Sequence, residues 1–144
     1  MLEITKEMET GIPEVDEQHR ELVSKVNNLI ALKEKGITEE ETKKTLDFLA
    51  EYAVMHFKTE EDLMTRCVYP ACYLHEGQHK FFVDKFLAFK HRFENEGHSD
   101  VLSTELNTFL VSWLINHIKV SDMDFGRHYI KSMSQLSLEE TIAD

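Results

Sequence analysis

Hydrophobic residues recur at alternating steps of three and four along most of the chain. One such stripe consists of Leu46, Leu49, Ala53, His56, Glu60 and Leu63, and another of His75, His79, Phe82, Phe86, Phe89 and Phe93. This spacing places each set on one face of an α-helix. The alternation in steps of two that is typical of a half-buried strand is not found in the sequence. The pattern therefore predicts an all-α protein.

Capping and helix-breaking residues delimit the first two helices. Asp16 is suited to cap the start of the first helix, and Gly36 is suited to the left-handed position that ends a helix. Thr38 is followed three residues later by Glu41, which is the capping-box pattern. The second helix is therefore expected to begin near Glu39.

Similar signals delimit the third and fourth helices. Pro70 is suited to a first helical position, so the third helix is expected to begin there and to end at Gly97. Ser99 is the expected cap of the fourth helix. The stripe of that helix consists of Leu102, Leu106, Phe109, Leu110, Trp113, Leu114 and His117.

Four helices of similar length with short connections predict an antiparallel up-down-up-down bundle. At 144 residues the chain has the size of a single domain, which we divide into an N-terminal arm (1–15), the bundle (about 16–122) and a tail (123–144). A weaker apolar pattern in the tail predicts a short C-terminal helix.

Composition narrows the function classes. The chain is 42% hydrophobic and 30% charged, with two prolines and five glycines, as expected for a helical globular protein. The formal net charge of −11 argues against nucleic acid and anionic membranes as partners. Cys67 and Cys72 do not form a C-x-x-C motif and are interpreted as reduced thiols, consistent with a cytoplasmic location.

Residues of the types that bind metals occupy the apolar stripes themselves. They are His19, His56, Glu60, His75, His79 and His117, with Asp122 just beyond the fourth helix. In an antiparallel bundle all seven fall at the same end. Several ionisable groups buried together need a compensating partner, and a metal supplies one.

The number and type of these ligands indicate which metals fit. Five imidazoles and two carboxylates exceed the four ligands of a structural zinc site and suit two metal ions, with Glu60 and Asp122 available as bridges. Nitrogen and oxygen ligands without thiolate favour iron or manganese.

The spacing of five from His117 to Asp122 does not fit a straight α-helix, in which the two side chains would diverge by about 140°. The helix must therefore either end near Lys119 or loosen into a π-like turn, a distortion that is common beside functional sites. We predict the distortion at Lys119–Ser121.

A zinc protease is an alternative, because His75-Glu76-Gly77-Gln78-His79 matches H-E-x-x-H with Glu76 as general base. The residues that follow, Lys-Phe-Phe-Val, supply no third ligand of the metzincin type. That interpretation also leaves His19, His56, Glu60 and Asp122 unused, so we disfavour it. The remaining histidines, at positions 91, 98 and 128, lie off the stripes or in a loop and are interpreted as surface or tail residues.

The ordered set of ligands resembles that of hemerythrin, and most closely of the prokaryotic bacteriohemerythrins. The matching motifs are Asp16-Glu-Gln-His19, His56-x-x-x-Glu60, His75-x-x-x-His79 and Trp113-Leu-Ile-Asn-His117-Ile-x-x-x-Asp122. The resemblance runs from about Gly11 to Tyr129, and every ligand position is present.

The resemblance implies a non-haem di-iron centre. One iron would be held by His75, His79 and His117, and the other by His19 and His56. Glu60, Asp122 and an oxide or hydroxide would bridge the two ions. Dioxygen would bind at the second iron, which is one ligand short.

The function implied is reversible dioxygen binding in a carrier, store or local supplier, not an enzyme. The alternative keeps the site but makes the protein an oxygen or redox sensor, or a di-iron protein that handles nitric oxide, peroxide or iron. Bulky apolar residues are expected around the open position, where they would form a dry pocket in addition to packing the core: Leu22, Phe57, Trp113, Leu114 and Ile118. Dioxygen is the only partner predicted.

Overall fold

The computed structural model describes residues 2–36 and 39–143, and all regular structure within them is helical. The elements are a short 3-10 turn Lys6–Met8, helix α1 (Pro13–Lys35), α2 (Glu39–Arg66), α3 (Cys72–Glu96), α4 (Asp100–Asn116), a π-helical segment His117–Asp122 and α5 (Met123–Ala143). No helix in these ranges is long and apolar enough to cross a membrane.

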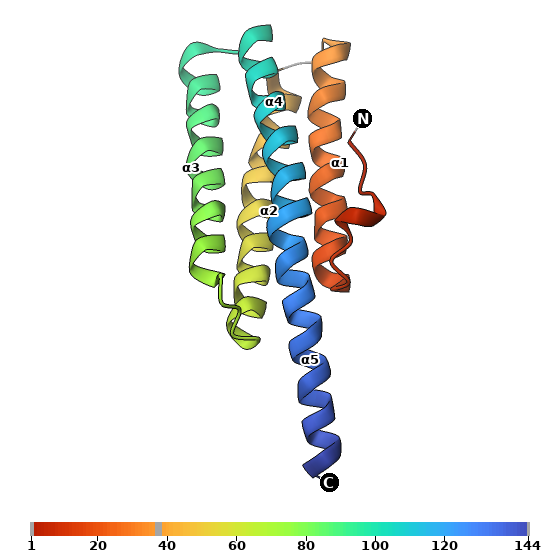
Figure 1. Ribbon diagram of the computed structural model, residues 1–144. Helices are drawn as coiled ribbons and strands as arrows, with labels where there is room; N and C mark the ends of the chain where they lie inside the picture. The colour runs from red at the N-terminus through yellow and green to blue at the C-terminus, as the bar shows by residue number, and fades with distance from the viewer. Residues whose placement is uncertain (1, 37–38, 144) are drawn as a thin grey trace.

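Helices α1 to α4 form the predicted up-down-up-down bundle (Figure 1). Each helix packs against the next one in the chain, and α4 closes the bundle against α1. The π-helical segment and α5 continue α4 without a break, and α5 extends beyond the end of the bundle (Figure 1). The C-terminal helix is thereby confirmed, and at 21 residues it is far from short.

Helix α1 begins at Pro13, and its capping residue Ile12 lies four residues before the predicted cap Asp16. Asp16 therefore lies inside the first turn and is not the cap, which corrects the prediction. Its carboxylate accepts hydrogen bonds from Thr10 N and Thr10 Oγ1, at 2.8 and 2.7 Å, and from Gly11 N at 3.1 Å. Proline begins a helix without losing a hydrogen bond, which leaves the aspartate free to fix the arm that precedes it.

Several predicted helix ends are confirmed. Gly36 is left-handed (φ 67°) after α1, and Gly97 ends α3 with φ 80°. The Ser99 hydroxyl caps α4 by accepting a hydrogen bond from Leu102 N at 3.1 Å. The predicted cap Thr38 lies outside the described residues, although α2 begins at Glu39 as expected.

The start of α3 differs from the prediction. The helix begins at Cys72, and Pro70 belongs to the preceding turn, in which Cys72 N donates to Tyr69 O at 3.1 Å. Val68 is left-handed in this connection, with φ 50°, so the chain leaves α2 by a tight turn and has not resumed helical geometry at Pro70.

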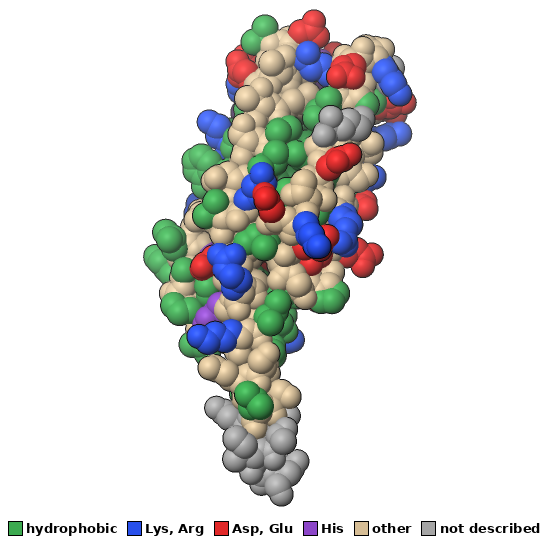
Figure 2. Space-filling model, turned by 45° about the vertical axis from the view of Figure 1, so that its right-hand side comes forward, with side chains coloured by type: hydrophobic (Ala, Val, Ile, Leu, Met, Phe, Trp, Pro, Cys, Tyr) green, Lys and Arg blue, Asp and Glu red, His purple; other side chains and the backbone are tan. Residues whose placement is uncertain are grey.

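Two apolar clusters fill the bundle on either side of a polar layer. The larger one extends toward the α1–α2 and α3–α4 connections, and its most buried members include Phe86, Leu106 and Leu110. The smaller one lies at the α2–α3 connection and includes Val15, Met64 and Phe125. On the outer face shown in Figure 2, acidic and basic side chains are interspersed.

Candidate metal centre

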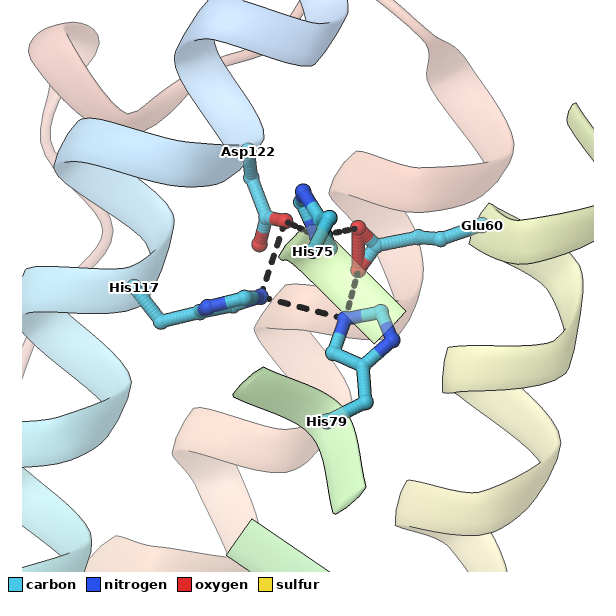
Figure 3. A group of neighbouring side chains, drawn as sticks. All are labelled: Glu60, His75, His79, His117 and Asp122. Atoms are coloured by element: carbon cyan, nitrogen blue, oxygen red, sulfur yellow. Dashed lines mark hydrogen bonds and ion pairs between the residues drawn. The ribbon is translucent and has the colours of Figure 1, made fainter. Parts of the chain in front are cut away.

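The seven ligand-type residues predicted from the sequence come together in one buried layer between the two apolar clusters. None of them is more than 4% exposed, and Glu60 and Asp122 are fully buried. Figure 3 shows five of them, from α2, α3 and the π-helical segment, with their polar ends directed toward a common centre. The expectation that all seven lie at the same end of the bundle is therefore met in the structure.

Helical spacing places most of these side chains without distortion. His56 and Glu60 lie one turn apart on α2, with His56 Nε2 2.8 Å from Glu60 Oε1. His75 and His79 lie one turn apart on α3, and their ring centroids are 4.6 Å apart. His19 from α1 completes the layer.

The π-helical segment brings the last two ligand-type residues to the same side. It runs from His117 to Asp122, so the predicted distortion at Lys119–Ser121 is confirmed and is slightly longer than expected. Residues five apart face the same way in a π-helix, and His117 Nε2 lies 3.1 Å from Asp122 Oδ1. The helix continues beyond this segment into α5, which excludes a helix end near Lys119.

The ligand atoms form two overlapping groups. His75, His79 and His117 belong to the first and His19 and His56 to the second, and Glu60 and Asp122 belong to both. Within each group, one ligand atom per residue lies within 4.8 Å of every other. Each group offers the nitrogen and oxygen donors of a metal site, and the two groups have their carboxylates in common.

Three of the five imidazoles have a hydrogen-bond partner on the side away from this centre. Gln18 Oε1 lies 2.7 Å from Nδ1 of His56, Glu61 Oε2 lies 2.9 Å from Nδ1 of His79, and Gln78 Oε1 lies 2.9 Å from Nδ1 of His117. Carboxylate and amide oxygens accept, so Nδ1 carries the proton and Nε2 keeps a lone pair directed at the centre. Sequence reasoning missed these three partners.

Nε2 of His79 and Nε2 of His117 face each other at 3.1 Å, and this contact tests whether a metal fits. With both Nδ1 atoms protonated, each neutral ring presents a lone pair to the other, which is repulsive without a cation between them. Burial lowers the pKa of His79 to about 3, and the nearby His117 and His75 act in the same direction. Protonation of the His79 ring is therefore a poor source of that cation.

The carboxylates are also poorly satisfied by protein atoms alone. Both oxygens of Glu60 and of Asp122 are buried without a hydrogen bond of acceptable geometry, as are Nε2 of His19 and of His75. Groups buried in this state are costly unless a partner compensates them. A donor set of imidazole nitrogens and carboxylate oxygens suits a transition-metal ion.

Two imidazoles instead attract protons in the absence of a metal. Burial alone would lower the pKa of His19, but the carboxylates of Asp122 and Glu60 outweigh it and raise the pKa to about 10. The same opposition of burial against Asp122 and Glu60 raises the pKa of His75 to about 9. The two buried carboxylates therefore strongly favour positive charge in this layer.

Aromatic rings cover part of this layer. The Phe57 ring stacks on His79, with centroids 4.0 Å apart, and the Trp113 ring stacks on His117 at 4.4 Å. The other residues predicted to line a gas pocket are buried nearby in the larger apolar cluster: Leu22, Leu114 and Ile118. Trp113 is only partly buried, and it also lines an outer groove between α3 and α4 of about 800 Å³.

The residues predicted to lie outside the site do so. His91 is exposed, and His98 is partly buried at the far end of the bundle beside Phe93. His128 in α5 is also partly buried, and its Nε2 donates to the carbonyl of Cys67 at 2.9 Å. Both cysteines are free, as expected for reduced thiols.

Comparisons with known proteins agree with this geometry. A family profile, the hemerythrin HHE cation binding domain, matches residues 10–129. A bacteriohemerythrin of Stenotrophomonas maltophilia is 28% identical over 133 residues, covering 92% of this chain and 84% of that protein. One from Clostridium acetobutylicum is 30% identical over 122 residues, covering 83% and 94%. A crystal structure of wild-type hemerythrin is similar with a TM-score of 0.77 and 28% identity, covering 90% of this chain and 97% of that one.

Proposed function

The chain belongs to the hemerythrin family, and from this premise we propose that it binds dioxygen reversibly at a pair of iron ions. The observation that carries the proposal is the pair of overlapping ligand groups that share Glu60 and Asp122. A protein with this property serves as a carrier, a store or a local supplier of the gas.

The inequality of the two groups suggests where the gas binds. His75, His79 and His117 would hold one ion, and His19 and His56 the other, with Glu60, Asp122 and an oxide or hydroxide as bridges. The second group offers one imidazole fewer, which leaves a position for dioxygen. When bound, the iron pair supplies the electrons that hold the gas and that are recovered on its release.

The chain's own contribution is to orient the ligands and to exclude water. Hydrogen bonds on Nδ1 hold three rings with Nε2 directed inward. Phe57, Leu114 and Ile118 are buried in the apolar wall above the layer, which limits the access of water and protons to the site. Five imidazoles and only two carboxylates make the donor set mostly neutral, which favours the return of the gas over substrate oxidation. We therefore propose a binding protein and not an enzyme.

Anaerobic loading with ferrous iron tests this proposal. The loaded protein is exposed to air and then flushed with argon, while its visible charge-transfer absorption is followed. We expect two iron ions per chain, and an absorption that appears with air and disappears under argon over repeated cycles. Protein loaded with zinc is the control and should show no such change.

Two histidine-to-alanine variants, one inside the layer and one outside it, provide a test and its matched control. His56→Ala removes one imidazole from the smaller group and should leave at most one tightly bound iron, with no reversible absorption. His91→Ala removes an exposed histidine far from the layer and should behave as the unmodified chain. Irreversible bleaching of the unmodified protein in air would instead favour a sensor, or a protein that handles nitric oxide, peroxide or iron.

A further inference from the structure

The hydrogen bonds on the outer side of the imidazoles form a regular series through the bundle. Gln18 of α1 supports His56 of α2, and Glu61 of α2 supports His79 of α3. In the same way Gln78 of α3 supports an imidazole of the π-helical segment that follows α4. Each supporting residue is also the sequence neighbour of a ligand-type residue on its own helix. The series therefore ties each ligand-bearing helix to the next one at the level of the metal layer.

One member of this series is chemically different from the other two. Gln18 and Gln78 offer neutral amide oxygens, whereas Glu61 offers a carboxylate, whose Oε2 lies 2.9 Å from Nδ1 of His79. The histidine is 3% exposed and the glutamate 34%, so the carboxylate reaches from the rim of the bundle to a buried ring. A hydrogen bond to an ionised acceptor is stronger than one to a neutral acceptor, and it increases the basicity of the opposite ring nitrogen.

We propose that Glu61 makes the two metal positions electronically unequal and lowers the reduction potential of the ion in the three-imidazole group. This inference rests on the proposed function, because it needs an iron ion on Nε2 of His79. The carboxylate strengthens that nitrogen as a donor and so stabilises the higher oxidation state of the ion that it holds. Glu61 is a positioning and tuning residue, since it acts through the His79 ring.

The neighbouring carboxylates do not have this geometry. Asp62 follows directly in the sequence, but its side chain is exposed on the outside of α2. Glu76 accepts a long contact from Cys72 Sγ at 3.5 Å. The potential at a buried site depends most on charges that reach it through little solvent, because water and salt screen the others. Asp62→Asn is therefore a suitable control for a general loss of surface charge.

Two substitutions at position 61 separate charge from hydrogen bonding. Glu61→Gln keeps an acceptor for His79 Nδ1 and removes the charge, and Glu61→Ala removes both. The measurement is spectroelectrochemical titration of the iron-loaded protein under argon. For Glu61→Gln we expect the ratio of reduced to oxidised iron at a fixed potential to rise about tenfold, a shift of about 59 mV for a one-electron couple. Asp62→Asn should leave the midpoint close to that of the unmodified chain.

A second substitution should rescue the first. Gln78 Oε1 accepts from the outer nitrogen of His117 and from Ser121 Oγ, at 2.9 and 2.6 Å, and a carboxylate can keep both bonds. Gln78→Glu would return a negative charge to the same three-imidazole group through a different ring. The double variant Glu61→Gln with Gln78→Glu should therefore recover most of the shift in midpoint, which a purely structural role for Glu61 does not predict.

Cobalt(II) binding gives a readout that does not depend on iron redox chemistry. Titration of the metal-free protein, followed by the visible absorption of the bound ion, should show weaker binding in one of the two positions. We expect about a 10- to 100-fold loss of affinity for Glu61→Ala, the range usual for loss of such outer hydrogen bonds. The loss should be smaller for Glu61→Gln.

The outcomes distinguish this inference from the function on which it rests. An unmodified protein that takes up no iron would overturn both. An unmodified protein that cycles with air and argon, together with a Glu61→Gln midpoint equal to the unmodified one, would overturn only the role of Glu61. A midpoint shift that appears in Glu61→Ala but not in Glu61→Gln would also overturn it, because loss of the hydrogen bond and not of the charge would then be the cause. A Glu61→Gln shift that Gln78→Glu does not recover would overturn it as well.

Discussion

The two halves of the bundle differ in what stabilises them. Toward the α3–α4 connection the core consists of hydrocarbon side chains, such as Phe86 and Leu106, at 2% and 1% exposure. Burial of such groups stabilises the fold without any ligand, by about 25 cal/mol per Å² of apolar surface. Toward the α2–α3 connection seven ionisable side chains replace that core over one layer, and several of their polar atoms lack partners.

Helix geometry accounts for both the apolar core of one half and the ligand layer of the other. The ligand-type residues occupy the same stripe positions as the leucines and phenylalanines of the other half, so the same helices carry both layers. The apolar half provides a rigid scaffold, and the polar half is incomplete until cations fill it. We therefore expect substitutions in the polar half to affect metal content most, and those in the apolar half to affect folding stability most.

The largest effect is expected for Glu60→Gln. Glu60 is fully buried and belongs to both ligand groups, and glutamine has nearly the same shape but is a poor bridge between two cations. Metal analysis after iron loading should find at most one ion per chain, and the air-dependent absorption should be lost. Glu51→Gln, at an exposed position on the same helix, is the control. Two tightly bound ions in Glu60→Gln would contradict the shared role.

The next largest effect is expected in the apolar half. Phe86→Ala should lower the free energy of unfolding of the metal-free protein by about 3–5 kcal/mol, because a cavity replaces a buried ring. Denaturant unfolding measures this loss, and metal analysis should still find two ions per chain. Leu87→Ala, at a side chain 48% exposed, should change stability much less. A fall in metal content in Phe86→Ala would show that the halves are not independent.

Features that depend on local spacing could be predicted from the sequence. The stripes place six of the seven ligand-type residues in the interior, all except Asp122, and Gly97 and Ser99 delimit helices by their own backbone and side-chain preferences. The spacing of five between His117 and Asp122 predicts a departure from α-helical geometry there, which the structure shows to be a π-helical segment and not a helix end. These features need no knowledge of the neighbouring helices.

Features that depend on packing between helices could not be predicted. Gln18, Glu61 and Gln78 look like ordinary polar residues beside the stripes, and only the rotation of each helix against the next brings them to a ring nitrogen. Asp16 looks like a helix cap, but the arm folds back and takes its carboxylate for Thr10. In both cases the partner is on another segment, which sequence periodicity does not specify.

A smaller effect is expected from pH on the folding stability of the metal-free protein. His19 and His75 have pKa values raised to about 10 and 9, against 6.5 when unfolded, because Asp122 and Glu60 outweigh the effect of burial. Their protonated forms stabilise the folded state fully below pH 6.5, and this contribution is lost as pH rises through 9 to 10.

Denaturant unfolding between pH 6.5 and 10 should show that loss in the metal-free chain, on the order of a few kcal/mol. The metal-loaded chain is the control. Its imidazoles already bind cations, so its stability should vary little over the same interval. A metal-free protein as stable at pH 10 as at pH 7 would show that protonation of His19 and His75 does not stabilise the polar half.

The smallest effect, a gain in folding stability, is expected for a substitution at Gly77, on the outer face of α3 between His75 and His79. A Cβ added at this position meets no atom within 4 Å, and alanine is favoured over glycine inside a helix by about 0.5–1 kcal/mol. Gly77→Ala should therefore raise the denaturation midpoint slightly and leave the metal content at two ions. In Gly126→Ala the new Cβ would lie 2.8 Å from Thr10 O, and stability should fall by about 1–3 kcal/mol. A loss of metal in Gly77→Ala would show that the ligand helix needs flexibility there, and that the polar half is constrained on its surface as well as in its interior.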